Sequence, residues 1–183
     1  MGPLTLTDGH LVLREWTDAD VPAMTELFDE PAVAYRTPLA SPFDEAAATA
    51  YLAMIRRTRA DGTRLHLAIT RDGGAPLGEV LLSLTHGALG YAIGAPHRGQ
   101  GLASRATRLL TAHAHDVLGL PRVILQIEPD NTASKAVARA AGFRLTDEPP
   151  ETAQSNGRTY TLLTWAHDAP ADLTRGRRSR CTP

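Results

Sequence analysis

The sequence predicts an α/β (α+β) fold, in which helices cover both faces of a mixed, mostly antiparallel central sheet of about seven strands. First, the chain has 183 residues, 43% hydrophobic and 21% charged, enough for one domain with a buried core. Second, apolar segments separated by turn residues, such as Arg71-Asp72-Gly73-Gly74, indicate adjacent antiparallel strands. Third, a strand-helix-strand order follows in the second half of the chain, which makes the sheet mixed.

Periodicity and capping residues place the individual elements. Apolar runs and alternating patterns predict strands at 11–16, 65–70, 77–84, 89–94, 123–127, 143–145 and 160–165. Apolar residues at helical spacing predict helices at 17–28, 43–60, 102–118 and 131–141. Ser41 or Asp44 is expected to cap the second helix, and Gly142 to end the last one. Residues 29–42 contain three prolines and are expected to form a loop.

Composition argues against several classes of function. The single cysteine, Cys181, allows neither a disulfide framework nor a cysteine-based zinc site, so we expect no metal and a reducing, cytoplasmic setting. Lys and Arg number 19 against 20 Asp and Glu, and this net charge of −1 argues against nucleic acid as the main partner. The chain shows no signal-peptide pattern and no apolar run near the roughly 18 residues of a membrane span, so no membrane partner is expected.

We expect a single domain over residues 1–167, followed by a basic, disordered tail over residues 168–183. The last nine residues of the chain hold four arginines, at positions 175, 177, 178 and 180. Such a tail either contacts an anionic partner or is simply a solvated chain end. The sequence leaves both interpretations open.

The segment from Tyr91 to Ser104 carries the clearest chemical signal. A strand leads into a turn that contains Gly99 and Gly101, and this turn opens directly into a long helix. Unpaired N–H groups and the helix dipole make such a helix N-terminus a site for phosphate, and glycines let the backbone approach the anion closely. Arg98 is expected to add a full positive charge. The segment fits neither a Walker A loop nor the Rossmann fingerprint.

Two motifs resemble the GNAT superfamily of acetyltransferases. Arg98-Gly99-Gln100-Gly101-Leu102-Ala103 fits the GNAT pattern Gln/Arg-x-x-Gly-x-Gly/Ala. Asn131-Thr132-Ala133-Ser134, followed by a helix that ends in Ala141-Gly142-Phe143, resembles the Asn-x-x-Ser … Gly-Phe signature of the RimJ/RimL-like branch. The opening Leu11-Val12-Leu13-Arg14, followed by Trp16-Thr17 and Asp20, also fits this branch, as does Tyr91. The resemblance covers residues 8–166, nearly the whole chain.

The resemblance implies an N-acetyltransferase that uses acetyl-CoA as co-substrate. The loop is then expected to hold the pyrophosphate through backbone amides, and the strand before it to lend backbone groups to the acetyl and pantetheine parts. A backbone N–H near Ala92 and Ile93 is expected to stabilise the oxyanion. The expected cofactor-binding residues are Tyr91, Ala92, Ile93, Arg98, Gly99, Gln100, Gly101, Leu102, Ala103, Ser104, Asn131 and Ser134.

The expected catalytic residues also follow from the resemblance. Many GNAT enzymes place a tyrosine five residues before the Phe of Gly-Phe as the general acid, but this chain has Ala138 there. Ser134 is the alternative acid, because the serine of Asn-x-x-Ser is thought to reach the CoA sulfur. Glu79, on the strand before Tyr91, and Glu128, at the end of the next strand, are the candidate bases. Ser134 is alternatively a helix residue with no role, and the two glutamates solvated edge residues.

The acceptor amine stays open between a peptide N-terminus and a small amine such as an antibiotic or a metabolite. An α-amino group has a pKa near 8, so roughly a tenth is already neutral at pH 7, whereas a lysine amine is almost fully charged. The lack of an obvious strong base therefore favours α-amines slightly. A non-catalytic acyl-CoA-binding module is the alternative from another class of function. A homodimer is common in the family and is possible here.

Overall fold

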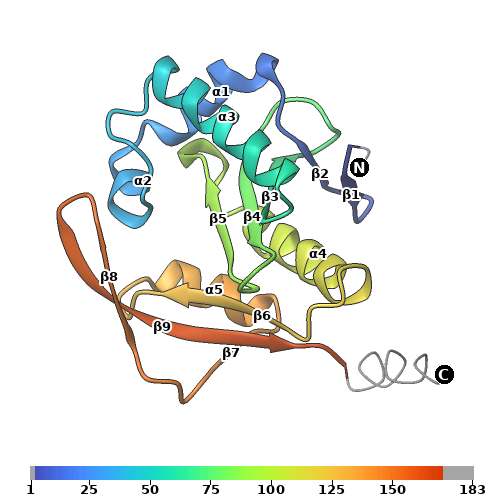
Figure 1. The fold of residues 1–183 in the computed structure, drawn as a ribbon, viewed down its shortest axis with the longest axis vertical. Coiled ribbons are helices and arrows are strands. Elements are labelled where there is room, and N and C mark those ends of the chain that lie inside the picture. The colour runs from blue at the N-terminus through green and yellow to red at the C-terminus, as the bar shows by residue number, and fades with distance from the viewer. Residues whose placement is uncertain (1–2, 171–183) are drawn as a thin grey trace.

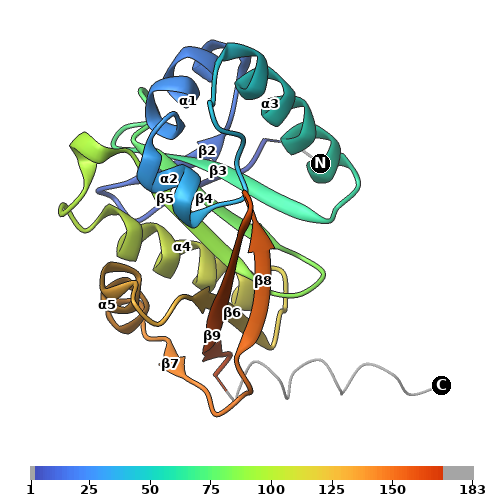
Figure 2. The ribbon, with the colours of Figure 1, turned by 90° about the vertical axis from the view of Figure 1, so that its left-hand side faces the viewer.

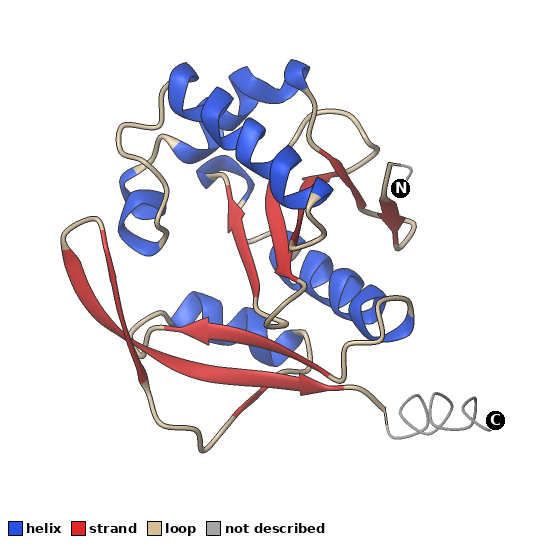
Figure 3. Ribbon diagram, in the orientation of Figure 1, coloured by secondary structure: helices blue, strands red, loops and turns tan. Residues whose placement is uncertain are grey.

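The computed structural model describes residues 3–170, and its architecture confirms the predicted class of fold (Figures 1 and 3). Within these residues nine strands are present: β1 Thr5–Thr7, β2 Val12–Glu15, β3 Arg64–Thr70, β4 Gly78–Ser83, β5 Leu89–Ile93, β6 Arg122–Ile127, β7 Arg144–Leu145, β8 Glu151–Ser155 and β9 Arg158–Asp168. The α-helices are α1 Val21–Phe28, α2 Pro31–Arg36, α3 Glu45–Ala60, α4 Leu102–Asp116 and α5 Thr132–Ala140. Short 3₁₀ helices precede α1 and α4, at Asp18–Asp20 and Ala95–His97.

The strands form two sheets that barely join. β1 to β5 make an antiparallel sheet in chain order, and β6, β9 and β7 make a second one to which β8 is added through β9. The two sheets meet at one parallel bridge between Ala88 and Ile124, where the Ile124 N–H donates to the Gly87 carbonyl at 2.9 Å. In Figure 1, β6 and β9 run across the lower end of β4 and β5. The sheet is therefore mixed at this junction alone, and it opens into a gap above it.

Helices cover both faces of the first sheet, as Figure 2 shows. α4 packs on one face, where Leu110 is fully buried with side chains of β2 to β6, and α5 packs against α4 and β6, where Ala138 is fully buried. α1, α2 and α3 pack on the other face around Phe28 and Phe43, whose ring centroids lie 5.5 Å apart in an edge-on arrangement. Both faces therefore have an apolar core, and the site can form only where the helices leave the sheet uncovered.

The predicted helix boundaries hold where a capping residue fixes them. The Asp44 carboxylate accepts a hydrogen bond from the Ala47 N–H at 2.9 Å, so Asp44 is the cap of α3. Gly142 follows α5 with φ of 88°, the left-handed conformation that suits glycine at the end of a helix.

Three elements were missed by the sequence prediction. Residues 29–42 were expected to be a loop, but α2 lies within them, because Pro31 stands in its first turn, where proline needs no N–H partner. β8 was missed because its residues are polar and largely exposed, so they lack the alternation of a half-buried strand. The Asn156-Gly157 pair, which forms a two-residue hairpin turn with positive φ at both positions, was the available signal. β1 has three residues, too few for a pattern.

The predicted domain end at residue 167 is close to the end of β9 at Asp168. The predicted tail lies outside the described residues from position 171 onward. Among the helices of residues 3–170, none has both the length and the apolar composition required to cross a membrane.

Candidate active site

The loop between β5 and α4 presents a row of unpaired backbone amides. Gly99 and Gly101 have φ of 72° and 74°, and Gly101 is the N-cap of α4. Within the described chain, the N–H groups of residues 99–104 donate no hydrogen bond. A Cβ atom built on either glycine meets no heavy atom within 4 Å, so the space beside this part of the loop is open. Unpaired amides at the positive end of a helix dipole are suited to bind an anion such as a phosphate group.

Arg98 does not add the free positive charge that the sequence suggested. Its guanidinium forms two hydrogen bonds to the Glu30 carboxylate, at 2.8 and 2.5 Å, and its Nε donates to the Ile93 carbonyl at 3.0 Å. The charge is therefore neutralised by Glu30, and Arg98 instead fastens the loop to the segment before α2. Gln100 also turns inward, because its amide donates to the Pro96 carbonyl while its oxygen accepts from Arg71.

A pocket of about 520 Å³ extends from this loop to α5 and α2. Apart from Gln100, the expected cofactor residues all line it: Tyr91, Ala92, Ile93, Arg98, Gly99, Gly101, Leu102, Ala103, Ser104, Asn131 and Ser134. The structure thus brings together two motifs that lie about thirty residues apart in the sequence. His97 lines the same pocket.

The gap between β5 and β6 exposes backbone groups of β5 on one edge. Hydrogen bonds from Ser83 to Ala88 and from Gly94 to Leu77 fix which β5 residues bond to β4. By the alternation of an antiparallel ladder, the Ala92 amide points toward β4, while the amides of Tyr91 and Ile93 point into the gap. The expected oxyanion donor near Ala92 and Ile93 is therefore narrowed to Ile93 or its neighbour Tyr91, since the Ala92 N–H is turned toward β4.

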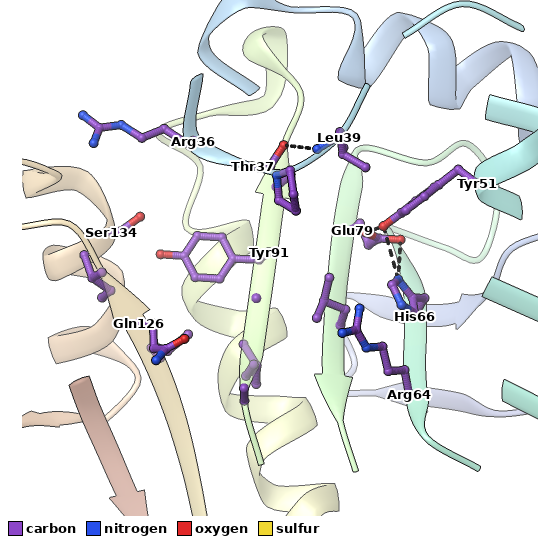
Figure 4. A pocket seen from close by; sticks show the side chains of 18 of the residues that line it. Arg36, Thr37, Leu39, Tyr51, Arg64, His66, Glu79, Tyr91, Gln126 and Ser134 are labelled. Carbon is purple, nitrogen blue, oxygen red and sulfur yellow. Dashed lines mark hydrogen bonds and ion pairs between the residues drawn. The ribbon is translucent and has the colours of Figure 1, made fainter. Parts of the chain in front are cut away.

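Ser134 and Tyr91 approach each other at this gap (Figure 4). Asn131 caps α5, because its side-chain oxygen accepts from the Ser134 N–H at 3.0 Å. The Tyr91 hydroxyl is buried and has no hydrogen-bond partner among the described residues. Burial raises the pKa of Tyr91, and the nearby Ser134 hydroxyl partly opposes this rise. Two hydroxyl groups thus lie close together, where α5 and β5 meet.

A second cleft, of about 630 Å³, lies on the α3 side of the sheet. Its lining is mainly apolar, from the segment between α2 and α3, from α3 itself, and from β4, β5, β6 and β9. It shares several residues with the cofactor pocket: Arg36, Thr37, Tyr91, Ala92, Asn131 and Ser134. The two pockets therefore meet at the gap between β5 and β6, as a reaction between two bound molecules requires.

Glu79 is buried in the wall of this second cleft, where it accepts two hydrogen bonds and contacts a histidine ring. Its Oε1 accepts from Trp16 Nε1 at 3.0 Å and lies 3.3 Å from His66 Nδ1, and its Oε2 accepts from the Tyr51 hydroxyl at 2.7 Å. Burial raises the pKa of Tyr51 well above its usual value, and the charge of Glu79 adds to this effect. Figure 4 shows the carboxylate turned toward Tyr51 and His66, away from Tyr91.

The partners of Glu79 were not predicted as site residues. Tyr51 appeared in the sequence as part of the apolar face of a helix, and Trp16 as the end of a strand. In residues 65–70 apolar and polar side chains alternate, and His66 is one of the polar ones. A histidine in the middle of a central strand could have indicated a site residue. His66 is 4% exposed.

Glu128 lies at the rim, where the two pockets meet, and its carboxylate is held by two arginines. Arg158 donates to both of its oxygens, at 2.6 and 2.8 Å, and Arg36 lies 3.0 Å from Oε1. The Arg158 hydrogen bonds, together with Arg36, hold the pKa of Glu128 below its usual value. A carboxylate that is held ionised in this way is a weak proton acceptor.

The tip of the β8–β9 hairpin holds the segment after α2, which forms one wall of the second cleft. The Asn156 side-chain amide donates to the carbonyls of Ala34, Thr37 and Leu39, at 2.9, 3.2 and 3.2 Å. In Figures 1 and 2 this tip lies beside α2. The segment after α2 is thereby held across the cleft. Among residues 3–170, no group of three or more His, Cys, Asp or Glu side chains is arranged to hold a metal ion.

Solved structures resemble this chain over nearly its whole length. A putative ribosomal-protein-serine acetyltransferase from Vibrio cholerae superposes with a TM-score of 0.80 at 18% identity, covering 92% of this chain and 99% of that one. RimJ from Mycobacterium smegmatis, solved with CoA-disulfide, gives a TM-score of 0.77 at 24% identity, covering 92% and 86%. The microcin C7 self-immunity acetyltransferase MccE, solved with acetyl-CoA and AMP, gives 0.75 at 18% identity, covering 88% and 93%.

No curated protein matches the chain. A scan against protein-family models matches residues 10–144 to the GNAT acetyltransferase domain, which is more than half of the sequence. The match includes β2 to α5, and therefore the amide row, the gap and the Glu79 cluster. The chain belongs to the GNAT family of acetyltransferases.

Proposed function

We propose that this protein is an acetyl-CoA-dependent N-acetyltransferase that transfers the acetyl group to a primary amine by direct attack in a ternary complex. The observation that carries this proposal is the meeting of two pockets at the gap between β5 and β6. One pocket ends on the row of unpaired amides, and the other has a buried carboxylate in its wall. A thioester and an amine bound in these pockets would meet near Tyr91 and Ser134.

In this proposal the amides of residues 99–104 hold the pyrophosphate of acetyl-CoA, and Asn131 and Ser134 line the path of the pantetheine arm. Relatives of the same fold support a CoA site, because two of them were solved with CoA-disulfide or acetyl-CoA. The pyrophosphate receives hydrogen bonds and the helix dipole but no ion pair from Arg98, whose charge is paired with Glu30. No metal is needed for this binding.

Acyl transfer also needs a donor for the oxyanion and a proton for the leaving thiolate. The Tyr91 or Ile93 amide, both of which point into the gap, is the proposed oxyanion donor. Ser134 is the proposed acid for the CoA sulfur, and the buried Tyr91 hydroxyl beside it keeps this region polar. The alternative reading of Ser134 as a helix residue without a role gives no account of why its side chain lines both pockets.

Glu79, rather than Glu128, is the proposed carboxylate on which removal of the amine proton depends. Glu79 lies in the wall of the cleft opposite the thioester position and is 3% exposed, which strengthens its electrostatic effect on a bound amine. Glu128 is instead engaged by Arg158 and Arg36, and we assign it the role of holding α2 against β6 and β9.

The acceptor is proposed to be an amine attached to an apolar group, either a peptide N-terminal α-amine or a small molecule. The mainly apolar lining of the cleft supports this class. Related structures include a RimL described as a ribosomal L7/L12 alpha-N-protein acetyltransferase, which supports the peptide class, and a microcin C7 self-immunity acetyltransferase, so relatives of the same fold differ in their described roles. Cytoplasmic location and a homodimer stay predictions.

The experiment that tests the proposal measures thiol release from acetyl-CoA with a panel of amines. The panel contains short peptides with free or blocked N-termini, polyamines, aminoglycosides and aminoacyl nucleotide analogues. Turnover that requires a free peptide N-terminus supports a protein acceptor, and turnover with a single small amine supports metabolism or resistance. Tight binding of acetyl-CoA without turnover on any amine would replace the proposal with a non-catalytic acyl-CoA-binding module.

A further inference from the structure

His66 has a buried nitrogen without a partner. The ring lies on β3, in the wall of the proposed acceptor cleft, and its side chain is 1% exposed. Nδ1 contacts Glu79 and Tyr51, but Nε2 is buried and has no hydrogen-bond partner among residues 3–170. Buried polar atoms are nearly always paired in folded proteins, so an unpaired one in the wall of a cleft indicates a partner that arrives with a ligand.

The contacts of Nδ1 fix the tautomer of the ring. Glu79 Oε1 lies 3.3 Å from Nδ1, and an ionised carboxylate only accepts hydrogen bonds. The Tyr51 hydroxyl already donates to Glu79 at 2.7 Å, so toward Nδ1 it also serves as an acceptor, at 3.3 Å. Nδ1 therefore carries the proton, and in the neutral ring Nε2 holds a free lone pair.

In the cluster around Glu79, the Nε2 atom of His66 is a basic nitrogen that forms no hydrogen bond with any other group of the cluster. The carboxylate already accepts from Trp16, Tyr51 and His66, and these donors stabilise its ionised form. Tyr51 keeps its own proton, because burial and the charge of Glu79 raise its pKa. An additional proton that enters this cluster is therefore best placed on Nε2, where the resulting imidazolium is stabilised by Glu79.

We infer that His66 is the proton acceptor for the amine substrate, and that Glu79 positions the ring and stabilises its charged form. The inference rests on the proposed acetyl transfer and names the atom that receives the proton, which is Nε2. Neither sequence motif includes His66. The arrangement has the same logic as other catalytic histidines that a carboxylate holds in one tautomer.

In the proposed step the acetyl group moves from the sulfur of CoA to the nitrogen of the amine. The lone pair of the neutral amine forms a bond to the thioester carbonyl carbon, and the carbon–sulfur bond then breaks. The proton that the nitrogen loses passes to His66 Nε2, directly or through one water molecule that enters with the amine. The CoA thiolate takes a proton from the Ser134 hydroxyl, and the proton on His66 returns to Ser134 through solvent. No oxidant, reductant or covalent enzyme intermediate is required.

The groups that face His66 come from three elements. Glu79 lies on β4 and Tyr51 on α3, while Arg64 lies two residues away on β3 and lines the same cleft. Trp16, at the end of β2, bonds to Glu79 but does not titrate. The pH profile of the reaction is therefore expected to be a property of this cluster, not of His66 alone.

The first experiment measures the tautomer of His66 in the wild-type protein, and it does not depend on turnover. Long-range proton–nitrogen correlation spectra of protein labelled with ¹⁵N-histidine distinguish the two ring nitrogens, and the His66→Gln spectrum assigns the signal by its loss. We expect a protonated Nδ1 and an unprotonated Nε2 at pH 7.5. A ring with the proton on Nε2 would have no free lone pair at that atom to accept the amine proton and would overturn the inference.

The second experiment compares kcat/KM across pH for wild-type protein, His66→Gln and the matched control His10→Gln, which makes the same change at an exposed histidine. For any active amine of the panel, His66→Gln is expected to lower kcat/KM at pH 7 by about 10²- to 10³-fold and to change the shape of its pH profile. Acetyl-CoA binding and the control should be unchanged. If the wild type turns over and His66→Gln keeps its pH profile, the assignment of His66 is wrong. If the wild type itself turns over no amine, the proposed function fails and the inference fails with it.

Discussion

Replacement of Gly101 by alanine tests the role of the amide row most directly. Gly101 has φ of 74°, and a Cβ built on it meets no heavy atom within 4 Å. The new methyl group would therefore project into the open space beside the unpaired amides of residues 99–104. We expect acetyl-CoA to bind more weakly, because a phosphate group can no longer approach those amides.

Gly62 provides a matched control. It follows α3, has φ of 66°, and a Cβ there also meets nothing within 4 Å, but it lines neither pocket. Alanine in the left-handed region costs about 1–2 kcal/mol, offset in part by about 0.4–1 kcal/mol from the less flexible unfolded chain. Gly101→Ala and Gly62→Ala should therefore lower the melting temperature of the free protein by a similar amount, about 1–4 °C.

The two variants should differ only when acetyl-CoA is present. Loss of one charged hydrogen bond, worth about 1.5–3 kcal/mol, weakens binding about 10- to 150-fold. At 100 times the wild-type Kd, the ligand stabilises the wild type by about 2.7 kcal/mol but Gly101→Ala by only about 0.3–1.4 kcal/mol. Thermal unfolding with and without acetyl-CoA, supported by calorimetric titration, measures this difference. Equal affinities of Gly101→Ala and Gly62→Ala would refute the assignment of the amide row.

Three further predictions concern stability. Glu128→Gln should lower the free energy of unfolding at pH 7 by about 1.5–3 kcal/mol in urea. The pKa of Glu128 is lowered in the folded protein, so its ionised carboxylate stabilises the fold above the pH at which a free glutamate titrates. This stabilisation is lost as the pH falls below that point, and Glu128→Gln should not show this loss. Burial and the nearby His115 lower the pKa of His167, so wild-type stability should fall as pH drops below about 6.5, and His167→Phe should flatten this fall. Ala138→Tyr, which restores the common family tyrosine at a fully buried position, should destabilise by at least about 1–3 kcal/mol and should not raise turnover; a stable, faster variant would contradict this.

The fold was largely predictable because its long elements carry local signals. The cap at Asp44 and the stop at Gly142 fix the ends of two helices through bonds within a few residues. The missed elements have no such pattern: α2 is a six-residue helix whose proline resembles a loop signal, and β8 is polar on both faces. Their positions are decided by contacts more than a hundred residues away, such as the bonds from Asn156 to Ala34 and Thr37.

The cofactor loop and the cluster around Glu79 also differ in how far the sequence predicts them. The cofactor loop is contiguous, and its function depends on backbone amides, so glycines and a following helix were enough to predict it. The charge of Arg98 was misjudged because its partner, Glu30, lies 68 residues away. The cluster around Glu79 is built from four separate elements, so no spacing in the sequence connects Trp16, Tyr51 and His66.

The acceptor cleft and the cofactor loop are held in place by different contacts. The segment after α2, which forms one wall of the acceptor cleft, is held by side chains of the β8–β9 hairpin, and the Glu79 cluster lies on the α3 side of the cleft, whereas the cofactor loop contributes to neither. Substitutions at the hairpin tip are therefore expected to act first on the acceptor cleft, and to reach the cofactor pocket only through α2, whose Arg36 and the following Thr37 line both pockets. Tyr91 and Ser134 also line both pockets, so a change there alters both bound molecules at once. Acceptor preference in this chain is thus expected to depend on the segment after α2 and the hairpin that holds it, while the chemistry depends on the few residues at the gap.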